Sequence, residues 1–336
     1  MPIRNISQTF ISEVQETARG TLPAGDDSSI GTDLVAWTKM KKILDEGVAG
    51  GKLFSGELVS TYSLVYTATA TYSGGVLAPN GDIHFIPYYA DKGQKISASG
   101  VISTYSLVYT TSGAYFGGVL APNGDIHFVP YAAAVGQKIS ASGVVSTYSL
   151  AYSASFAYFG GVLAPNGDIH FVPLNANRGQ KISASGVVST YSLVYSVGNG
   201  YFGGVLAPNG DIHFVPYSAS VGQKISAAGV VSTYSLAYSA SYAYFGGVLA
   251  PNGDIHFVPY GAAVGQKVSA SGVVSTYSLA YAFSFAYYGG VLAPNGDIHF
   301  VPAGSVGQKI TLNTGVNFSQ GICQSPFFNK FWGNNV

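Results

Sequence analysis

The 336-residue sequence predicts an all-β fold, a six-bladed β-propeller, from two observations. The segment Gly-Gly-Val-Leu-Ala-Pro-Asn-Gly-Asp-Ile-His-Phe occurs six times, and each copy starts 43 residues after the previous one, at Gly74, Gly117, Gly160, Gly203, Gly246 and Gly289. Each unit also holds four short runs rich in β-branched and aromatic residues. Four strands per repeat of about 40–45 residues is typical of propeller blades, which number four to eight. An open β-solenoid is the alternative fold, whereas the lack of a 3.6-residue period disfavours a helical solenoid.

The unit that starts at Gly117 shows how each blade is built. Residues 117–121 form a small apolar strand, and the Asn-Gly that follows makes a tight hairpin turn because both residues tolerate positive φ. Residues 126–129 form the second strand, and residues 137–140 form the third. Residues 144–152 alternate between small polar and larger apolar side chains and form the fourth strand.

The order of strands along the chain predicts a closed ring. One spare strand of the fourth type, residues 58–66, precedes the first unit, and the sixth unit ends near Asn313 without a fourth strand. We therefore expect the spare strand to complete blade six, which would leave no open sheet edge. The predicted domains are an N-terminal extension over 1–57, the propeller over 58–314 and an apolar tail over 315–336.

The two ends of the chain differ from the repeats. Residues 7–19 and 32–46 predict short helices, with Thr32 as an N-cap and Gly47 as a stop. The tail is rich in apolar side chains, including Phe327, Phe328 and Trp332. Because such short helices are marginal alone in water, we expect both ends to pack on the propeller or to bind other structural proteins.

The composition excludes several classes of protein. The net charge is zero and 9% of residues are charged, which is a poor electrostatic match for nucleic acid or anionic lipid. The one cysteine, Cys323, excludes an internal disulfide and a cysteine-rich zinc site. We expect a soluble chain without a secretory signal or membrane insertion, since the N-terminus lacks an apolar core and no apolar run reaches about 18 residues.

The repeat unit Gly-Gly-Val-Leu-Ala-Pro-Asn-Gly-Asp-Ile-His-Phe-Val-Pro resembles the Pro-Asn-Gly-type propeller repeats of large DNA viruses and marine phages. It is also similar to the NHL class of propeller, in which an inner strand, a glycine-containing turn and an aromatic second strand follow one another. The resemblance covers residues 58–313 and implies the fold, while propellers host many unrelated activities. It implies a virion-associated or tail-fibre-like protein and carries over no catalytic residue.

Comparison of the six copies locates the variation in two loops. One loop joins the fourth strand to the next blade, and the other joins the second strand to the third. In an antiparallel blade both loops emerge on one face, and the nearly invariant turns emerge on the other. Variation on one rim of a rigid scaffold is how binding surfaces diversify, although neutral drift of exposed loops gives the same pattern.

The variable loops hold the candidate binding residues. Position 70 and its equivalents read Ala70, Gly113, Phe156, Asn199, Tyr242 and Phe285. Rings at three of these six positions, with polar neighbours, are suited to stacking on sugars or to anchoring a protein partner; packing between blades is the alternative. The predicted ligand-binding residues are Phe156, Tyr242, Phe285, Asn199, Tyr88, Asp91, Lys92 and Arg178.

The six Asp-x-His pairs are the strongest chemical motif, and residues i and i+2 of a strand share a face. Six identical copies favour a structural role, in which each histidine bonds a tyrosine, serine or aspartate between blades. The variable loops hold a single acid, Asp91, which argues against a glycosidase, and we expect neither a metal nor a cofactor. The sequence thus predicts a non-enzymatic module that binds a surface glycan or protein receptor; the alternative is an assembly scaffold bound through its termini.

Overall fold

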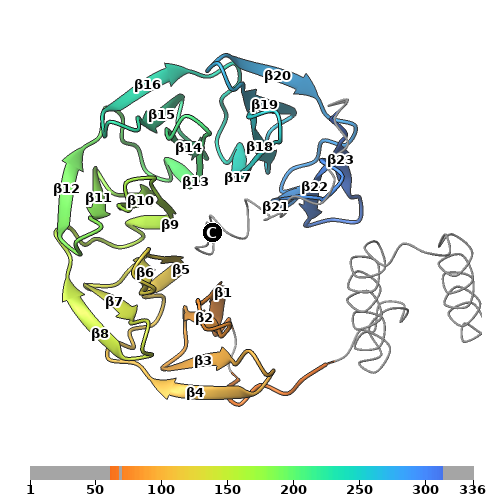
Figure 1. Cartoon of the computed structure of the whole chain (residues 1–336). Helices are drawn as coiled ribbons and strands as arrows, with labels where there is room; N and C mark the ends of the chain where they lie inside the picture. The colour runs from red at the N-terminus through yellow and green to blue at the C-terminus, as the bar shows by residue number, and fades with distance from the viewer. Residues whose placement is uncertain (1–60, 68–69, 313–336) are drawn as a thin grey trace, which may run out of the picture. The chain divides into compact units, whose positions relative to one another are not determined.

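The computed structural model describes residues 61–67 and 70–312, which form six antiparallel sheets, the blades of a β-propeller. The chain divides into two units, 1–63 and 64–336, and nearly all described residues lie in the second. Within that unit the sheets follow one another around a common centre (Figure 1). The described residues contain no helix that could span a membrane. The predicted helices and the apolar tail lie outside the described residues.

The blades share one order of strands. The first strands, nearest the centre in Figure 1, are β1 (Tyr72–Leu77), β5 (Tyr115–Leu120), β9 (Tyr158–Leu163), β13 (Tyr201–Leu206), β17 (Tyr244–Leu249) and β21 (Tyr287–Leu292). The second strands are β2 (Ile83–Pro87), β6 (Ile126–Pro130), β10 (Ile169–Pro173), β14 (Ile212–Pro216), β18 (Ile255–Pro259) and β22 (Ile298–Pro302). The third strands are β3 (Lys92–Ile96), β7 (Val135–Ile139), β11 (Arg178–Ile182), β15 (Val221–Ile225), β19 (Val264–Val268) and β23 (Gln308–Ile310). The fourth, outermost strands are β4 (Ile102–Ser106), β8 (Val145–Ser149), β12 (Val188–Ser192), β16 (Val231–Ser235) and β20 (Val274–Ser278).

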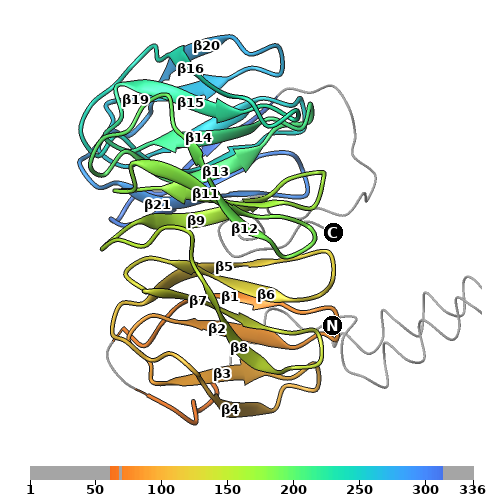
Figure 2. The same cartoon turned by 90° about the vertical axis from the view of Figure 1, so that its left-hand side faces the viewer.

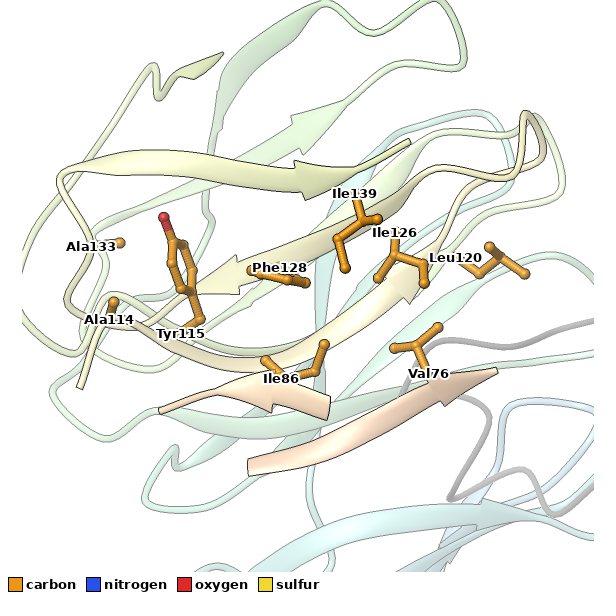
Figure 3. Close-up of a cluster of buried hydrophobic side chains, with 9 residues drawn as sticks. All are labelled: Val76, Ile86, Ala114, Tyr115, Leu120, Ile126, Phe128, Ala133 and Ile139. Atoms are coloured by element: carbon orange, nitrogen blue, oxygen red, sulfur yellow. The ribbon is translucent and has the colours of Figure 1, made fainter. Parts of the chain in front are cut away.

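The core lies between neighbouring blades. Val76 and Ile86 of blade one face Tyr115, Ile126 and Phe128 of blade two, and all five side chains are buried (Figure 3). This packing needs a glycine on the inner strand, because a Cβ at Gly118 would lie 2.6 Å from Ile86 Cδ1. The repeated Gly-Gly pair therefore sets the close approach of the blades.

A glutamine of the next blade accepts backbone hydrogen bonds from the chain after each described fourth strand, and it is buried except for Gln308 in blade six. After β4 the chain leaves the sheet, and the Val108 and Tyr109 N–H groups donate to Gln137 Oε1 at 2.9 and 2.8 Å. The same exit from β8 lets Tyr152 N–H donate to Gln180 Oε1 at 2.7 Å. The fourth strand of blade two consequently ends at Ser149 rather than at the predicted residue 152.

The predicted closure of blade six by residues 58–66 is not observed in the described part of that segment. Residues 61–66 form no strand, and the sixth sheet contains three strands within the described residues. The Val65 and Tyr66 N–H groups donate to Gln94 Oε1, the same link that Val108 and Tyr109, after the fourth strand β4, make to the next blade. β23 has three residues where the other third strands have five, because within the described residues it pairs with β22 alone.

Candidate binding face

The two variable loops of the sequence lie on one face and are joined through their backbones. The Ala157 N–H donates to the Tyr131 carbonyl at 2.7 Å, and the Ala243 N–H donates to the Tyr217 carbonyl at 2.7 Å. Each bond links the loop that enters one blade to the second-to-third-strand loop of the preceding blade. In Figure 2 the loops gather at two opposite ends of the strands, as predicted.

The variable position at Phe156 and its equivalents has a left-handed backbone. The φ angle is 56° at Phe156, 59° at Tyr242 and 64° at Phe285. This region favours glycine and asparagine, and the equivalent positions carry Gly113 and Asn199, with φ of 68° and 54°. Three copies therefore hold a bulky ring where the backbone disfavours one, which is a recognised mark of functional sites.

These three rings are half-exposed and rest on tyrosines of the preceding blade. The exposed fractions are 47% for Phe156, 42% for Tyr242 and 50% for Phe285. Their ring centroids lie 4.8, 5.0 and 4.8 Å from those of the tyrosines, with interplanar angles of 50°, 55° and 50°. The three ring pairs are Tyr131 with Phe156, Tyr217 with Tyr242, and Tyr260 with Phe285.

A central aromatic cluster, which the sequence analysis missed, lies beside the ring pairs. Phe159 stacks against Phe116 and Phe202 at centroid distances of 4.0 and 3.3 Å, and Phe202 stacks against Phe245 at 3.9 Å. Phe159 and Phe245 come from blades two apart and still lie 6.0 Å from each other, so the rings converge between the inner strands. The signal was an aromatic residue before Gly-Gly in five copies, at Phe116, Phe159, Phe202, Phe245 and Tyr288.

A bulge in each inner strand turns these rings toward the centre. In blade two the pairing passes from Tyr115 with Pro130 to Gly118 with Phe128, and the register shifts between them. Gly117 adopts a φ of 81° within this shift. A bulge with a left-handed glycine bends its strand and redirects a neighbouring side chain, here that of Phe116.

The remaining predicted site residues fall into two groups. Tyr88 joins the aromatic cluster, with its centroid 5.3 Å from that of Phe116. Asn199 is bound within the variable loops, since its backbone N–H donates to Asn175 Oδ1 at 2.7 Å. Arg178 is exposed and covers the ring of Tyr152 at 5.2 Å.

Asp91 and Lys92 are exposed at the start of β3. Asp91 forms a hydrogen bond with the Tyr66 hydroxyl, and this bond raises the pKa of Tyr66. Among the described contacts, none joins Asp91, Lys92 or Arg178 to a ring pair. The structure thus groups the predicted aromatic residues and separates them from the predicted charged ones.

Five of the six histidines are buried, and each of these five lies near the hydroxyl of a tyrosine. His127 is buried, and its Nδ1 lies 3.3 Å from the Tyr148 hydroxyl of the same blade, so the predicted bond is made within a blade and not between blades. Burial lowers the pKa of His127 to about 4, and the Lys138 charge adds to this effect while Asp125 opposes it. The imidazole is therefore neutral at neutral pH.

The aspartate of the Asp-x-His motif has its own partners. Asp125 accepts from Lys138 Nζ at 2.7 Å and from the Ala141 N–H at 3.2 Å, so it ties the two invariant turns together. The Lys138 hydrogen bond, the Ala141 N–H and the lysine charge keep the pKa of Asp125 below its ordinary value although burial acts in the other direction. Asp125 and His127 therefore have different hydrogen-bond partners, and the described residues contain no cluster of metal-binding side chains.

The family model described as the virginiamycin B lyase family matches residues 24–308. The chain belongs to the virginiamycin B lyase family. None of the proteins with curated descriptions matches the sequence.

Solved structures of this family share the fold. A streptogramin B lyase is 22% identical, with a TM-score of 0.59 over 73% of this chain and 84% of that one. A virginiamycin B lyase from Staphylococcus aureus is 20% identical, with a TM-score of 0.60 over 72% and 85%. A catalytically inactive histidine variant of the S. aureus enzyme, solved with quinupristin, is 18% identical, with a TM-score of 0.60 over 74% and 88%. At these identities the likeness establishes the six-bladed propeller fold. It does not bear on the viral origin that the resemblance of the repeat implied.

Proposed function

We propose that this member of the family is a non-enzymatic binding module that presents its variable-loop face to a surface glycan or a protein receptor. The observation that carries the proposal is the placement of Phe156, Tyr242 and Phe285 in a left-handed backbone conformation while their rings stay half-exposed. A ring that served only to pack the blades would be expected to be buried. Packing does not require a ring at this position, because another copy has Gly113 there. Exposed, rigidly held aromatic side chains are the usual anchors of recognition surfaces.

The distribution of titratable groups supports the non-enzymatic part of the proposal. All six histidines of the chain belong to the repeat, and five of them are buried; the sixth, His299, lies in the three-stranded blade. The variable loops hold one acid, Asp91. Because relatives of this fold are lyases, the direct check is incubation with quinupristin followed by chromatography. We expect no conversion, and turnover above that of heat-denatured protein would contradict this part.

The binding part is tested with a matched pair of triple variants. In the first, Phe156→Asn, Tyr242→Asn and Phe285→Asn remove the rings but keep a residue that tolerates the left-handed backbone. In the second, Val144→Asn, Val187→Asn and Val230→Asn change three valines that are each 61% exposed and lie in the invariant turns.

The two variants and the unchanged full-length protein are screened on a glycan array and on whole cells. We expect the ring variant to lose the binding that the valine variant keeps. Equal binding by all three proteins would sink the assignment of the variable-loop face.

Three further predictions from the sequence belong to this proposal, and the described residues do not test them. A virion-associated or tail-fibre-like location rests on the resemblance of the repeat. Contacts with other structural proteins through residues 1–57 and 315–336 rest on their composition. Completion of blade six by the segment that begins at residue 58 rests on the order of the strands.

A further inference from the structure

The junctions between blades fall into two chemical classes. Three junctions carry a ring pair, and their second-to-third-strand loops, residues 131–135, 217–221 and 260–264, contain no charged residue. The two other junctions whose loops the structure describes in full have Gly113 or Asn199 in place of the ring. Their loops carry the charged residues Asp91 and Lys92, or Arg178.

The three ring-pair junctions are close copies of one another. Their centroid distances agree within 0.2 Å and their interplanar angles within 5°. The more exposed ring of each pair follows an exposed serine, namely Ser155, Ser241 or Ser284. The same half-exposed ring beside the same hydroxyl thus occurs at three places on one rigid scaffold.

The chemistry of each junction suits an uncharged ligand with one apolar face and a hydroxyl edge. Burial raises the pKa of Tyr131, Tyr217 and Tyr260, so these phenols stay neutral at physiological pH. A half-exposed ring offers a flat apolar surface, and the serine next to it offers a donor and an acceptor. A neutral pyranose has a matching apolar C–H face and a rim of hydroxyl groups.

We propose that the three ring-pair junctions are equivalent subsites for the neutral sugar units of one repeating polysaccharide. This inference rests on the proposed function of the variable-loop face and names its ligand class. A repeated subsite matches a repeated ligand, because once one unit is bound the next binding event becomes intramolecular. Three weak subsites joined in this way gain a factor of about 10²–10⁴ in apparent affinity over a single one.

The experiment measures binding of the full-length protein to laminarin and galactomannan as neutral polymers, to alginate and heparin as anionic polymers, and to the matching monosaccharides. Affinity electrophoresis and calorimetry supply the readouts. We expect binding to at least one neutral polymer, at least 100-fold weaker binding to its monosaccharide, and no preference for the anionic polymers.

Variants separate the subsites. Phe156→Asn, Tyr242→Asn and Phe285→Asn are each expected to weaken polymer binding about tenfold, and the triple variant to abolish it. The control is the triple variant Val144→Asn, Val187→Asn and Val230→Asn in the invariant turns, which is expected to leave neutral-polymer binding unchanged. A separate charge variant, Lys92→Gln with Arg178→Gln, tests whether the charged junctions bind the polymers.

Other outcomes overturn the inference in recognisable ways. Preference for alginate or heparin that the charge variant removes, or a full loss from one ring variant alone, contradicts three neutral subsites. A protein receptor whose binding needs the rings, with no polysaccharide bound, defeats this inference but leaves the proposed function standing. Folded protein that binds neither polymer nor cells defeats both.

Discussion

In blades one to five a glycine of the third strand makes room for the tyrosine that bonds the buried histidine, and blade two shows the arrangement. A Cβ built on Gly136 would overlap the ring of Tyr148, which lies across it from β8. The substitution Gly136→Ala must therefore displace that ring. Displacement breaks the contact between the Tyr148 hydroxyl and His127 Nδ1 and the edge-on ring contact at 5.5 Å.

The expected cost follows from those losses. Overpacking of a close site costs about 1–3 kcal/mol, and a buried polar group left without its partner adds about 1–3 kcal/mol. We expect Gly136→Ala to lower the free energy of unfolding by about 2–6 kcal/mol, which corresponds to a fall in Tm of about 4–24 °C for a domain of this size. Calorimetry and urea titration of the full-length protein measure both quantities.

The chain supplies its own control for this prediction. Gly307 is the equivalent residue of blade six, and a Cβ there would meet no atom within 4 Å. Gly307→Ala should therefore change stability by less than about 0.5 kcal/mol. A Gly136→Ala variant within about 0.5 kcal/mol of the unchanged protein would refute the steric argument. A cost at Gly307 as large as that at Gly136 would instead contradict the three-stranded blade six and favour the closure predicted from sequence.

Three further predictions concern stability. Burial lowers the histidine pKa from 6.5 to about 4 in five blades, at His84, His127, His170, His213 and His256. Between these two pH values the unfolded chain binds more protons than the folded protein. The protein therefore loses stability as the pH falls from 6.5 toward 4. The free energy of unfolding, measured by urea titration at pH 7, 6 and 5, should fall by up to about 1.4 kcal/mol per pH unit for each histidine. His127→Gln should make this pH dependence shallower. An unchanged pH dependence in that variant would contradict the role of His127 in it. Asp168→Ala should lower the free energy of unfolding by about 1–3 kcal/mol, because the Ala184 N–H loses its acceptor. Lys181→Met should lower it by less than about 1 kcal/mol, because the lysine is partly exposed. Chemical denaturation compares the two variants, and a larger loss for Lys181→Met would contradict this prediction. Phe156→Asn should change the free energy of unfolding by less than about 1 kcal/mol, because asparagine tolerates the left-handed backbone and this gain offsets the lost ring contact. Phe128→Ala in the core should lower it by about 3–5 kcal/mol. Similar losses for the two variants in a thermal melt would show that Phe156 is a core residue.

The candidate face was only partly visible in the sequence. The variable position occupied by Phe156 could be found by comparing the copies, because identical units make every difference stand out. Its left-handed φ and its partner Tyr131 could not, since both depend on how the entering loop docks on the previous blade. The central cluster was missed because Phe116 sits in a bulge, and a bulge breaks the two-residue alternation from which the direction of a side chain is read.

The sequence by itself determined the number of blades, the four strands of blades one to five and the invariant hairpin turns, because these depend on local residue preferences that recur in every repeat. It also determined that all histidines belong to the repeat. Only the tertiary structure decided what each polar group bonds: His127 meets Tyr148, and Asp125 meets Lys138 and a neighbouring turn. Proximity along a strand shows which residues share a face, but the partner comes from the adjacent strand, and register and packing set its position.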